Sequence, residues 1–120
     1  VDNELQLLQA FGELLESEGA YATLCTSAEE AVRTAVSGAF DAVISDLAMP
    51  EHDGHWLARQ LRAHDATRNV ALIAVSGMTR ETDRSQAQAA GFDAHLNKPV
   101  DLELLAKTLF TVMAKHPRKP

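Results

Sequence analysis

The sequence predicts an α/β fold in which helices cover both faces of a doubly wound parallel sheet. Short apolar runs alternate along the chain with longer amphipathic stretches, which is the order in which β-strands and crossover helices follow one another. The most apolar run, residues 70–75, has the length and composition of a strand buried on both faces. With 120 residues, the chain fits one domain over residues 1–120.

The N-terminal part predicts a helix, a strand and a second helix. Leu and Phe recur at three- and four-residue steps across residues 4–18, which is the period of an amphipathic helix. Residues 21–25 are a short strand candidate. Thr26 or Ser27 then caps a second helix that runs to about Ser37.

The middle of the chain predicts two buried strands with a helix between them. Residues 40–45 are rich in β-formers and lie between turn signals, and Asp46 stands at their C-terminal end. A third helix is predicted over residues 54–63, and the strand at residues 70–75 is followed by Ser76.

The rest of the chain predicts a polar helix at residues 80–90, a last strand at 92–96, a final helix at 102–114 and a frayed tail at 116–120. The first helix begins almost at Val1, although the first strand of an open α/β sheet is often central. We therefore expect a truncated first strand, whose slot is empty or only begun by Val1. Such an exposed slot is prone to aggregation or is filled by a neighbouring chain.

Composition and charge narrow the classes of function. The chain is 46% hydrophobic and 23% charged, as soluble globular proteins are, and no apolar run approaches the roughly 20 residues that span a bilayer. A formal net charge of −6 argues against binding to nucleic acid or anionic lipid. The single Cys25 cannot form an internal disulfide, which fits a reducing compartment. We expect a cytoplasmic protein that contacts neither nucleic acid nor membrane.

Polar side chains stand where the predicted strands end. Because ligands of open α/β sheets bind at the carboxyl ends of the strands, these side chains are expected to converge in one crevice: Asp2, Asn3, Asp46, Ser76 and Lys98. Carboxylates and an amide offer hard oxygen ligands for Mg²⁺, whereas a hydroxyl and an ammonium are donors for phosphoryl oxygens. The set predicts chemistry on a phosphoryl group.

The order and spacing of these residues resemble the receiver domain of response regulators and hybrid histidine kinases. The resemblance rests on the run Asp46-Leu-Ala-Met-Pro-Glu-His-Asp-Gly54, on Val-Ser76-Gly and on Lys98-Pro99. It also rests on the separations, 30 residues from Asp46 to Ser76 and 22 from Ser76 to Lys98. It covers essentially the whole chain and implies a flavodoxin-like sheet with strand order 2-1-3-4-5.

The resemblance implies a role for each of these residues. Asp46 resembles the phosphoacceptor, which attacks a phosphohistidine or a small acyl phosphate. Ser76 resembles the switch hydroxyl, and Lys98 the lysine that pairs first with the acceptor carboxylate and then with the phosphate. Pro99 resembles the family's cis proline, and Gly77 leaves space for the phosphoryl group. The plainer alternatives are a capping Asp, a turn Ser and Gly, and a solvated Lys.

The resemblance also implies a magnesium site formed by Asp2, Asn3, Asp46 and Ala48. The family ends its first strand with two adjacent acids, and here the second of them is Asn3, a neutral ligand. We therefore expect weak binding of Mg²⁺. A register shifted by one residue would instead make Asp2 the direct metal carboxylate.

The histidines form no metal-binding pattern. His95 stands where the family has a Tyr or Phe that reports the switch, so it is either that reporter, with added pH sensitivity, or a partly exposed histidine without a role. The remaining histidines are expected at the surface: His52, His55, His64 and His116. Trp56 is expected to be a packed helix residue.

Two other functions compete with the phosphoacceptor reading. A phosphatase of the haloacid dehalogenase type needs a second Asp two places after the nucleophile, where this chain has Ala48. Ala48 and Met78 offer no polar group to align a hydrolytic water, so we expect a signalling domain with at most slow self-dephosphorylation rather than an enzyme. A pseudo-receiver, which binds proteins without phosphorylation, is favoured by Asn3 and opposed by the retained Asp46, Ser76 and Lys98. The expected partner is a histidine kinase or a histidine phosphotransfer domain, and homodimerisation stays open.

Overall fold

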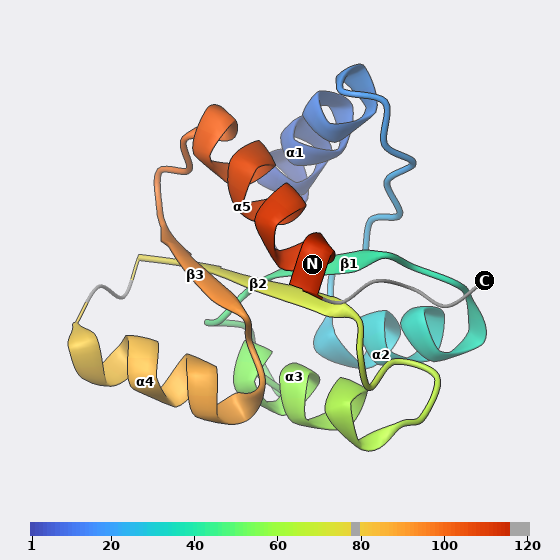
Figure 1. Ribbon diagram of the computed structural model, residues 1–120, viewed down its shortest axis with the longest axis vertical. Coiled ribbons are helices and arrows are strands. Elements are labelled where there is room, and N and C mark those ends of the chain that lie inside the picture. The colour runs from blue at the N-terminus through green and yellow to red at the C-terminus, as the bar shows by residue number, and fades with distance from the viewer. Residues whose placement is uncertain (78–79, 116–120) are drawn as a thin grey trace.

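A parallel sheet of three strands, in the order β1-β2-β3, lies between two layers of helices (Figure 1). The computed structural model describes residues 1–77 and 80–115. The strands are β1 (Ala42–Asp46), β2 (Ala71–Ser76) and β3 (Ala94–Asn97). The helices are α1 (Leu5–Ser17), α2 (Ala28–Ser37), α3 (Gly54–Ala63), α4 (Glu81–Ala90) and α5 (Leu102–Lys115). α1 and α5 cover one face of the sheet, and α2, α3 and α4 cover the other.

The central strand β2 is buried along all of its length, because β1 and β3 pair with its two edges and helices cover its two faces. The register places Asp46 opposite Val75 and Ser76 opposite Asn97. The strands are parallel, so their carboxyl ends meet at one edge of the sheet. The residues expected to carry chemistry therefore come to this edge.

Two apolar clusters hold the layers together. The cluster between the sheet and α2, α3 and α4 includes Ala31, Leu57 and Leu72. The smaller cluster on the other face includes Ile73 and Leu105. Ser27 and Asp53 fix where α2 and α3 begin, since each side chain accepts a hydrogen bond from a backbone N–H of the first turn.

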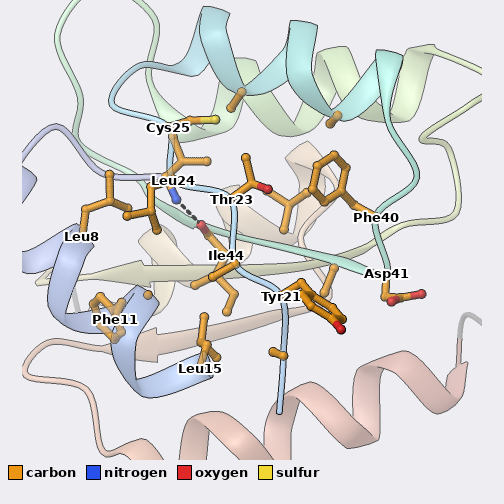
Figure 2. A pocket seen from close by; sticks show the side chains of 18 of the residues that line it. Leu8, Phe11, Leu15, Tyr21, Thr23, Leu24, Cys25, Phe40, Asp41 and Ile44 are labelled. Atoms are coloured by element: carbon orange, nitrogen blue, oxygen red, sulfur yellow. Dashed lines mark hydrogen bonds between the residues drawn. The ribbon is translucent and has the colours of Figure 1, made fainter. Parts of the chain in front are cut away.

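The element order and most bounds agree with the sequence, but the predicted strand at residues 21–25 is wrong. That segment is irregular (Figure 2). A strand needs a ladder of hydrogen bonds to a neighbouring strand, and only the Cys25 end of this segment has backbone beside it to pair with. Val1 accepts a hydrogen bond from the Asp46 N–H over 2.9 Å, and the Asp2 N–H donates to the Cys25 carbonyl over 3.2 Å. The expectation that Val1 only begins the first-strand slot is confirmed. The predicted tail at 116–120 lies outside the described residues.

Arg62, on α3, ties together the loops at the amino edge of the sheet. Its guanidinium donates to the carbonyl oxygens of Gly91 (2.8 and 3.0 Å), Val70 (2.6 Å) and Arg68 (2.8 Å), and it forms an ion pair with Asp93 at 3.0 Å. Both charged side chains are about four-fifths buried. The sequence pattern had given Arg62 no role.

No helix within the described residues combines the length and the apolar character that crossing a bilayer requires.

Candidate functional site

Two carboxylates and one ammonium meet at the carboxyl edge of the sheet. The Lys98 Nζ lies 3.2 Å from Asp46 Oδ2 and 3.3 Å from Asp2 Oδ2. The Asp46 and Asp2 side chains are 10% and 6% exposed, whereas that of Lys98 is 26% exposed. Residues 96 positions apart in the sequence are thus brought together.

The charges in this cluster support each other. Burial alone would lower the pKa of Lys98, but the Asp46 and Asp2 carboxylates outweigh burial and raise that pKa above its ordinary value. Lys98 is therefore a firmly held cation beside a nearly buried carboxylate. A group that arrives with negative charge next to Asp46 meets a cation already in place.

The loop after β1 holds Asp46 by short-range contacts. The Ala48 N–H donates to Asp46 Oδ1 over 3.4 Å, and the Ser45 hydroxyl donates to the Asp46 carbonyl over 2.8 Å. Gly54 begins α3 so close to the strand that an added Cβ would lie 2.4 Å from the Asp46 carbonyl oxygen. The carboxylate is fixed between the end of a strand and the start of a helix.

Ser76 and Gly77 lie at the end of β2, next to this cluster. Ser76 is buried, and its carbonyl accepts the Lys98 N–H over 3.0 Å. A Cβ at Gly77 would meet nothing within 4 Å, so the space beside it is open. The Lys98–Pro99 peptide bond is cis, as the resemblance implies.

The residues predicted to hold a metal differ in their surroundings. Asp2 Oδ1 already accepts the Glu4 N–H over 2.9 Å, and Asn3 is exposed. In residues 1–77 and 80–115, no three His, Cys, Asp or Glu side chains are grouped so that they could hold a metal ion. Two carboxylates and the backbone carbonyl of Ala48 are still hard oxygen donors that suit Mg²⁺, with water as the remaining ligands.

His95 is half-buried, and its ring makes no hydrogen bond to the described residues. Both of its ring nitrogens are buried and have no partner within the described part of the chain, and the same holds for Nε2 of His55. Burial lowers the pKa of His95, as do the nearby Arg84 guanidinium and His55, while Asp83 raises it. The native fold therefore favours the neutral imidazole.

We expect acidification to destabilise the protein through His95. The pKa of His95 is lower in the folded protein than the unfolded value of 6.5. Neutral His95 therefore contributes its full share to the free energy of unfolding above pH 6.5, and this share is lost as the pH falls from 6.5 towards the folded pKa. In a pH series of urea unfolding, the free energy of unfolding of His95→Phe should fall less than that of the parent as the pH drops below 6.5. An unchanged pH dependence in the variant would remove His95 as its source.

Of the other histidines predicted at the surface, His52 lies in the loop before α3 and His64 follows the last residue of that helix. The expectation for His55 is wrong, because its side chain, in the first turn of α3, is only 18% exposed. His116 lies outside the described residues.

His52 stacks on Trp56, with ring centroids 3.9 Å apart and planes 15° from parallel. Trp56 is half-buried and packs against the larger cluster. Arg84 is a residue that the sequence analysis missed: it donates to the Asn97 side chain at 3.2 Å and the His95 carbonyl at 3.4 Å. A single Arg on a polar helix carries no pattern that would have marked it.

Comparison with known proteins gives a consistent result. The model of the response regulator receiver domain matches residues 1–110. The polar-differentiation response regulator DivK of Brucella anthropi is 28% identical over 109 residues, which are 90% of this chain and 87% of that protein. An uncharacterised 14.6 kDa protein of Leptolyngbya boryana is 39% identical over 93 residues, 77% of this chain and 71% of that protein. Hybrid signal transduction histidine kinase D of Dictyostelium discoideum is 30% identical over 81% of this chain, which is 6% of that kinase.

Solved structures agree in fold. The receiver domain of a sensor histidine kinase from Pseudomonas aeruginosa PAO1, with magnesium coordinated in its active-site cleft, superposes with a TM-score of 0.87 at 28% identity, over 95% of this chain and 93% of that one. The chemotaxis protein CheY4 of Vibrio cholerae superposes with a TM-score of 0.88 at 25% identity, over 92% of each chain. The flavodoxin-like α/β fold predicted from the sequence is confirmed.

Proposed function

Because this chain belongs to the response regulator receiver domain family, we propose that residues 1–120 accept a phosphoryl group on Asp46 from a histidine kinase or a histidine phosphotransfer domain. The observation that supports this most is the contact of the Lys98 ammonium with Asp46 and Asp2 at the carboxyl ends of parallel strands. Receiver domains are signalling domains rather than classical enzymes.

The chemistry requires little beyond position and charge. An Asp46 carboxylate oxygen attacks the phosphorus of a phosphohistidine, a P–O bond forms as the P–N bond breaks, and the imidazole leaves with the electron pair of that bond. Lys98 stabilises the charge on the phosphoryl oxygens. Asp2, Asp46 and the Ala48 carbonyl would hold Mg²⁺, which would supply further positive charge to the phosphoryl group. With Ala48 in place of a polar side chain, self-dephosphorylation is slow.

An apolar groove beside Lys98 suits the phosphodonor. It runs between α1 and the start of α5 and is lined by Leu7, Ala10, Phe11, Leu14, Pro99 and Val100. Lys98 also lines this groove. An amphipathic helix seated there by its apolar face would carry a phosphohistidine towards Asp46.

The proposal is tested by measuring the mass of the protein before and after incubation with a phosphodonor. Incubation with Mg²⁺ and a small acyl phosphate should add the mass of one phosphoryl group to the protein, and omission of Mg²⁺ should reduce the yield. No added mass after hours with an excess of the reagent would favour the alternative, a pseudo-receiver that acts as a phosphorylation-independent interaction module. The replacement of an expected acid by Asn3 is the observation behind that alternative.

Ser76 is proposed as the switch hydroxyl, which moves to donate to a phosphoryl oxygen. We expect Ser76→Ala to be phosphorylated at a rate within about threefold of the parent, since the nucleophile and Lys98 stay in place. Its response to phosphorylation should be weakened, because the donor that moves is lost. The measurement is phosphorylation-dependent binding to the partner or the change in Trp56 emission. Equal responses in Ser76→Ala and the parent would exclude the switch role.

Magnesium binding should be limited by charge. The cluster has two carboxylates opposed by one ammonium, so restoring an acid with Asn3→Asp should tighten Mg²⁺ binding about tenfold, an effect on the order of 1–2 kcal/mol for one added charge contact in a partly solvated cleft. Titration followed by Trp56 emission measures it. Glu4→Gln, a charge change one residue further along and also exposed, is the control and should shift the affinity much less. No gain in Asn3→Asp would mean that residue 3 does not face the metal.

A further inference from the structure

Helix α4 is held on the sheet by few apolar side chains. It lies against α3 and β3 (Figure 1), and its buried residues are one acid and two alanines: Asp83, Ala87 and Ala90. The neighbouring helix α3, by comparison, buries Leu57 and Leu61. An alanine side chain removes little apolar surface from water, so the position of α4 depends on polar contacts more than that of α3 does.

Arg84 fastens α4 to β3. One of its terminal guanidinium nitrogens donates to the His95 carbonyl over 3.4 Å, and the other donates to the Asn97 side chain over 3.2 Å. Both bonds are exposed to solvent, so each stabilises the contact only modestly. A change of charge beside this contact can therefore detach the helix.

Asp83 holds the first turn of α4. Its Oδ2 atom accepts from the Arg80 backbone N–H over 3.2 Å and from the Arg80 side-chain Nε over 3.3 Å. The side chain of Asp83 is only 11% exposed, whereas that of Arg80 is 83% exposed. The backbone contact satisfies an amide that the helix itself leaves unpaired, so the start of α4 is weakened if Asp83 turns to another donor.

His95 lies among charged groups, and both of its ring nitrogens are buried without a hydrogen-bond partner among the described residues. β2 places the uncharged Ala74 opposite His95 in the ladder. The charged groups that act on the ring come from α3 and α4: His55, Asp83 and Arg84. Burial lowers the pKa of this imidazole, as do Arg84 and His55, whereas Asp83 raises it.

A second proton on the ring would disturb both attachments of α4. An imidazolium has two N–H donors, and a buried charge without an acceptor is costly. One relief is that Asp83 turns from the Arg80 N–H to the ring, which unties the first turn. The other is that the imidazolium and the Arg84 guanidinium move apart, although that guanidinium is bonded to the His95 backbone. Either movement breaks a polar contact that holds the helix.

We propose that protonation of His95 releases helix α4 from β3, so that a fall in pH loosens one side of the molecule while the rest stays folded. The proton is the ligand of this device, and Arg84 sets the pH at which it binds by repelling the charged ring. Release uncovers the face of the sheet that α4 covers. The device goes beyond the proposed acceptance of a phosphoryl group, because it needs neither Asp46 nor a phosphodonor.

The test follows amide hydrogen exchange by NMR between about pH 8 and pH 5, the range in which a histidine titrates. The Cε1 resonance of His95 gives the titration midpoint in the same samples. After correction for intrinsic exchange, we expect protection of the α4 amides to fall about tenfold more than that of the α3 amides as the pH passes this midpoint. His95→Phe, which keeps a ring but cannot be protonated, should lose this difference. The control is His64→Gln, because His64 is exposed at the end of α3, and it should retain the difference.

Arg84→Met adds a second measurement. Loss of the guanidinium should raise the titration midpoint of His95, because a repelling cation is removed. Four results would overturn the proposal: an equal fall of protection in α3 and α4, an undiminished fall in His95→Phe, titration of His95 with α4 protection unchanged, or an unmoved midpoint in Arg84→Met. No phosphodonor is present in these measurements, so their outcome is independent of phosphorylation at Asp46.

Discussion

Replacing Asp46 by Asn is expected to abolish phosphorylation, with a decrease in labelling rate of more than ~100-fold. The amide keeps the size of the side chain but has neither the charge nor the nucleophilic oxygen that forms the new bond. Its carbonyl oxygen can still accept the Ala48 N–H, and Lys98 keeps its contact with Asp2. The fold should therefore persist, with an unfolding midpoint close to that of the parent.

The measurement is the added phosphoryl mass over time, alongside circular dichroism to verify the fold. Asp65→Asn is a suitable control, because Asp65 is 88% exposed and lies outside the site, so its labelling should equal that of the parent. Labelling of Asp46→Asn at the parent rate would place the phosphate on another residue and refute the assignment.

Removing the Arg62 guanidinium should lower the free energy of unfolding more than any other substitution considered above or below. Arg62→Met retains the apolar stem but removes the donor to the Gly91 and Val70 carbonyls and the ion pair with Asp93. Breaking a mostly buried ion pair together with several hydrogen bonds costs about 3 kcal/mol in the free energy of unfolding. Urea unfolding monitored by circular dichroism measures that change.

Arg68→Met is the matched control. The Arg68 side chain is 60% exposed and pairs with Asp65 at the surface, where an ion pair contributes less than about 1 kcal/mol. A loss for Arg62→Met no larger than that for Arg68→Met would show that the loops at this edge do not depend on the guanidinium.

Local pattern predicted most of the secondary structure and the composition of the site. The third helix is predicted and observed over the same residues, 54–63, because its turn signals, its cap at Asp53 and its apolar period all act within a few residues. Asp46, Ser76 and Lys98 could be placed at one edge because parallel strands bring their carboxyl ends together. These inferences needed only short-range chemistry and one rule of topology.

Properties that depend on distant partners could not be predicted. Residues 21–25 have the composition of a strand, but they form no strand because little backbone lies beside them to complete a hydrogen-bonded ladder. Leu5 fits the apolar period of α1 yet is 54% exposed. It is the first residue of the helix, and the apolar period does not predict whether the neighbouring elements extend far enough to cover that end. Arg62 is one basic residue among many in the sequence, and its importance comes from carbonyls that lie up to 29 positions away.

The tight junction at Gly54 has a mechanical consequence. The Gly54 N–H donates to the Leu47 carbonyl over 2.9 Å, and there is no room for even a methyl group between the start of α3 and the backbone of Asp46. Because the backbones are in such close contact, a displacement of the end of β1 should move the start of α3 with it, and the loop between them cannot absorb the movement. The last turn of α3 carries Arg62, which donates hydrogen bonds to the loops at the amino edge of the sheet. The helix α3 thus links the carboxyl edge of the sheet mechanically to its amino edge.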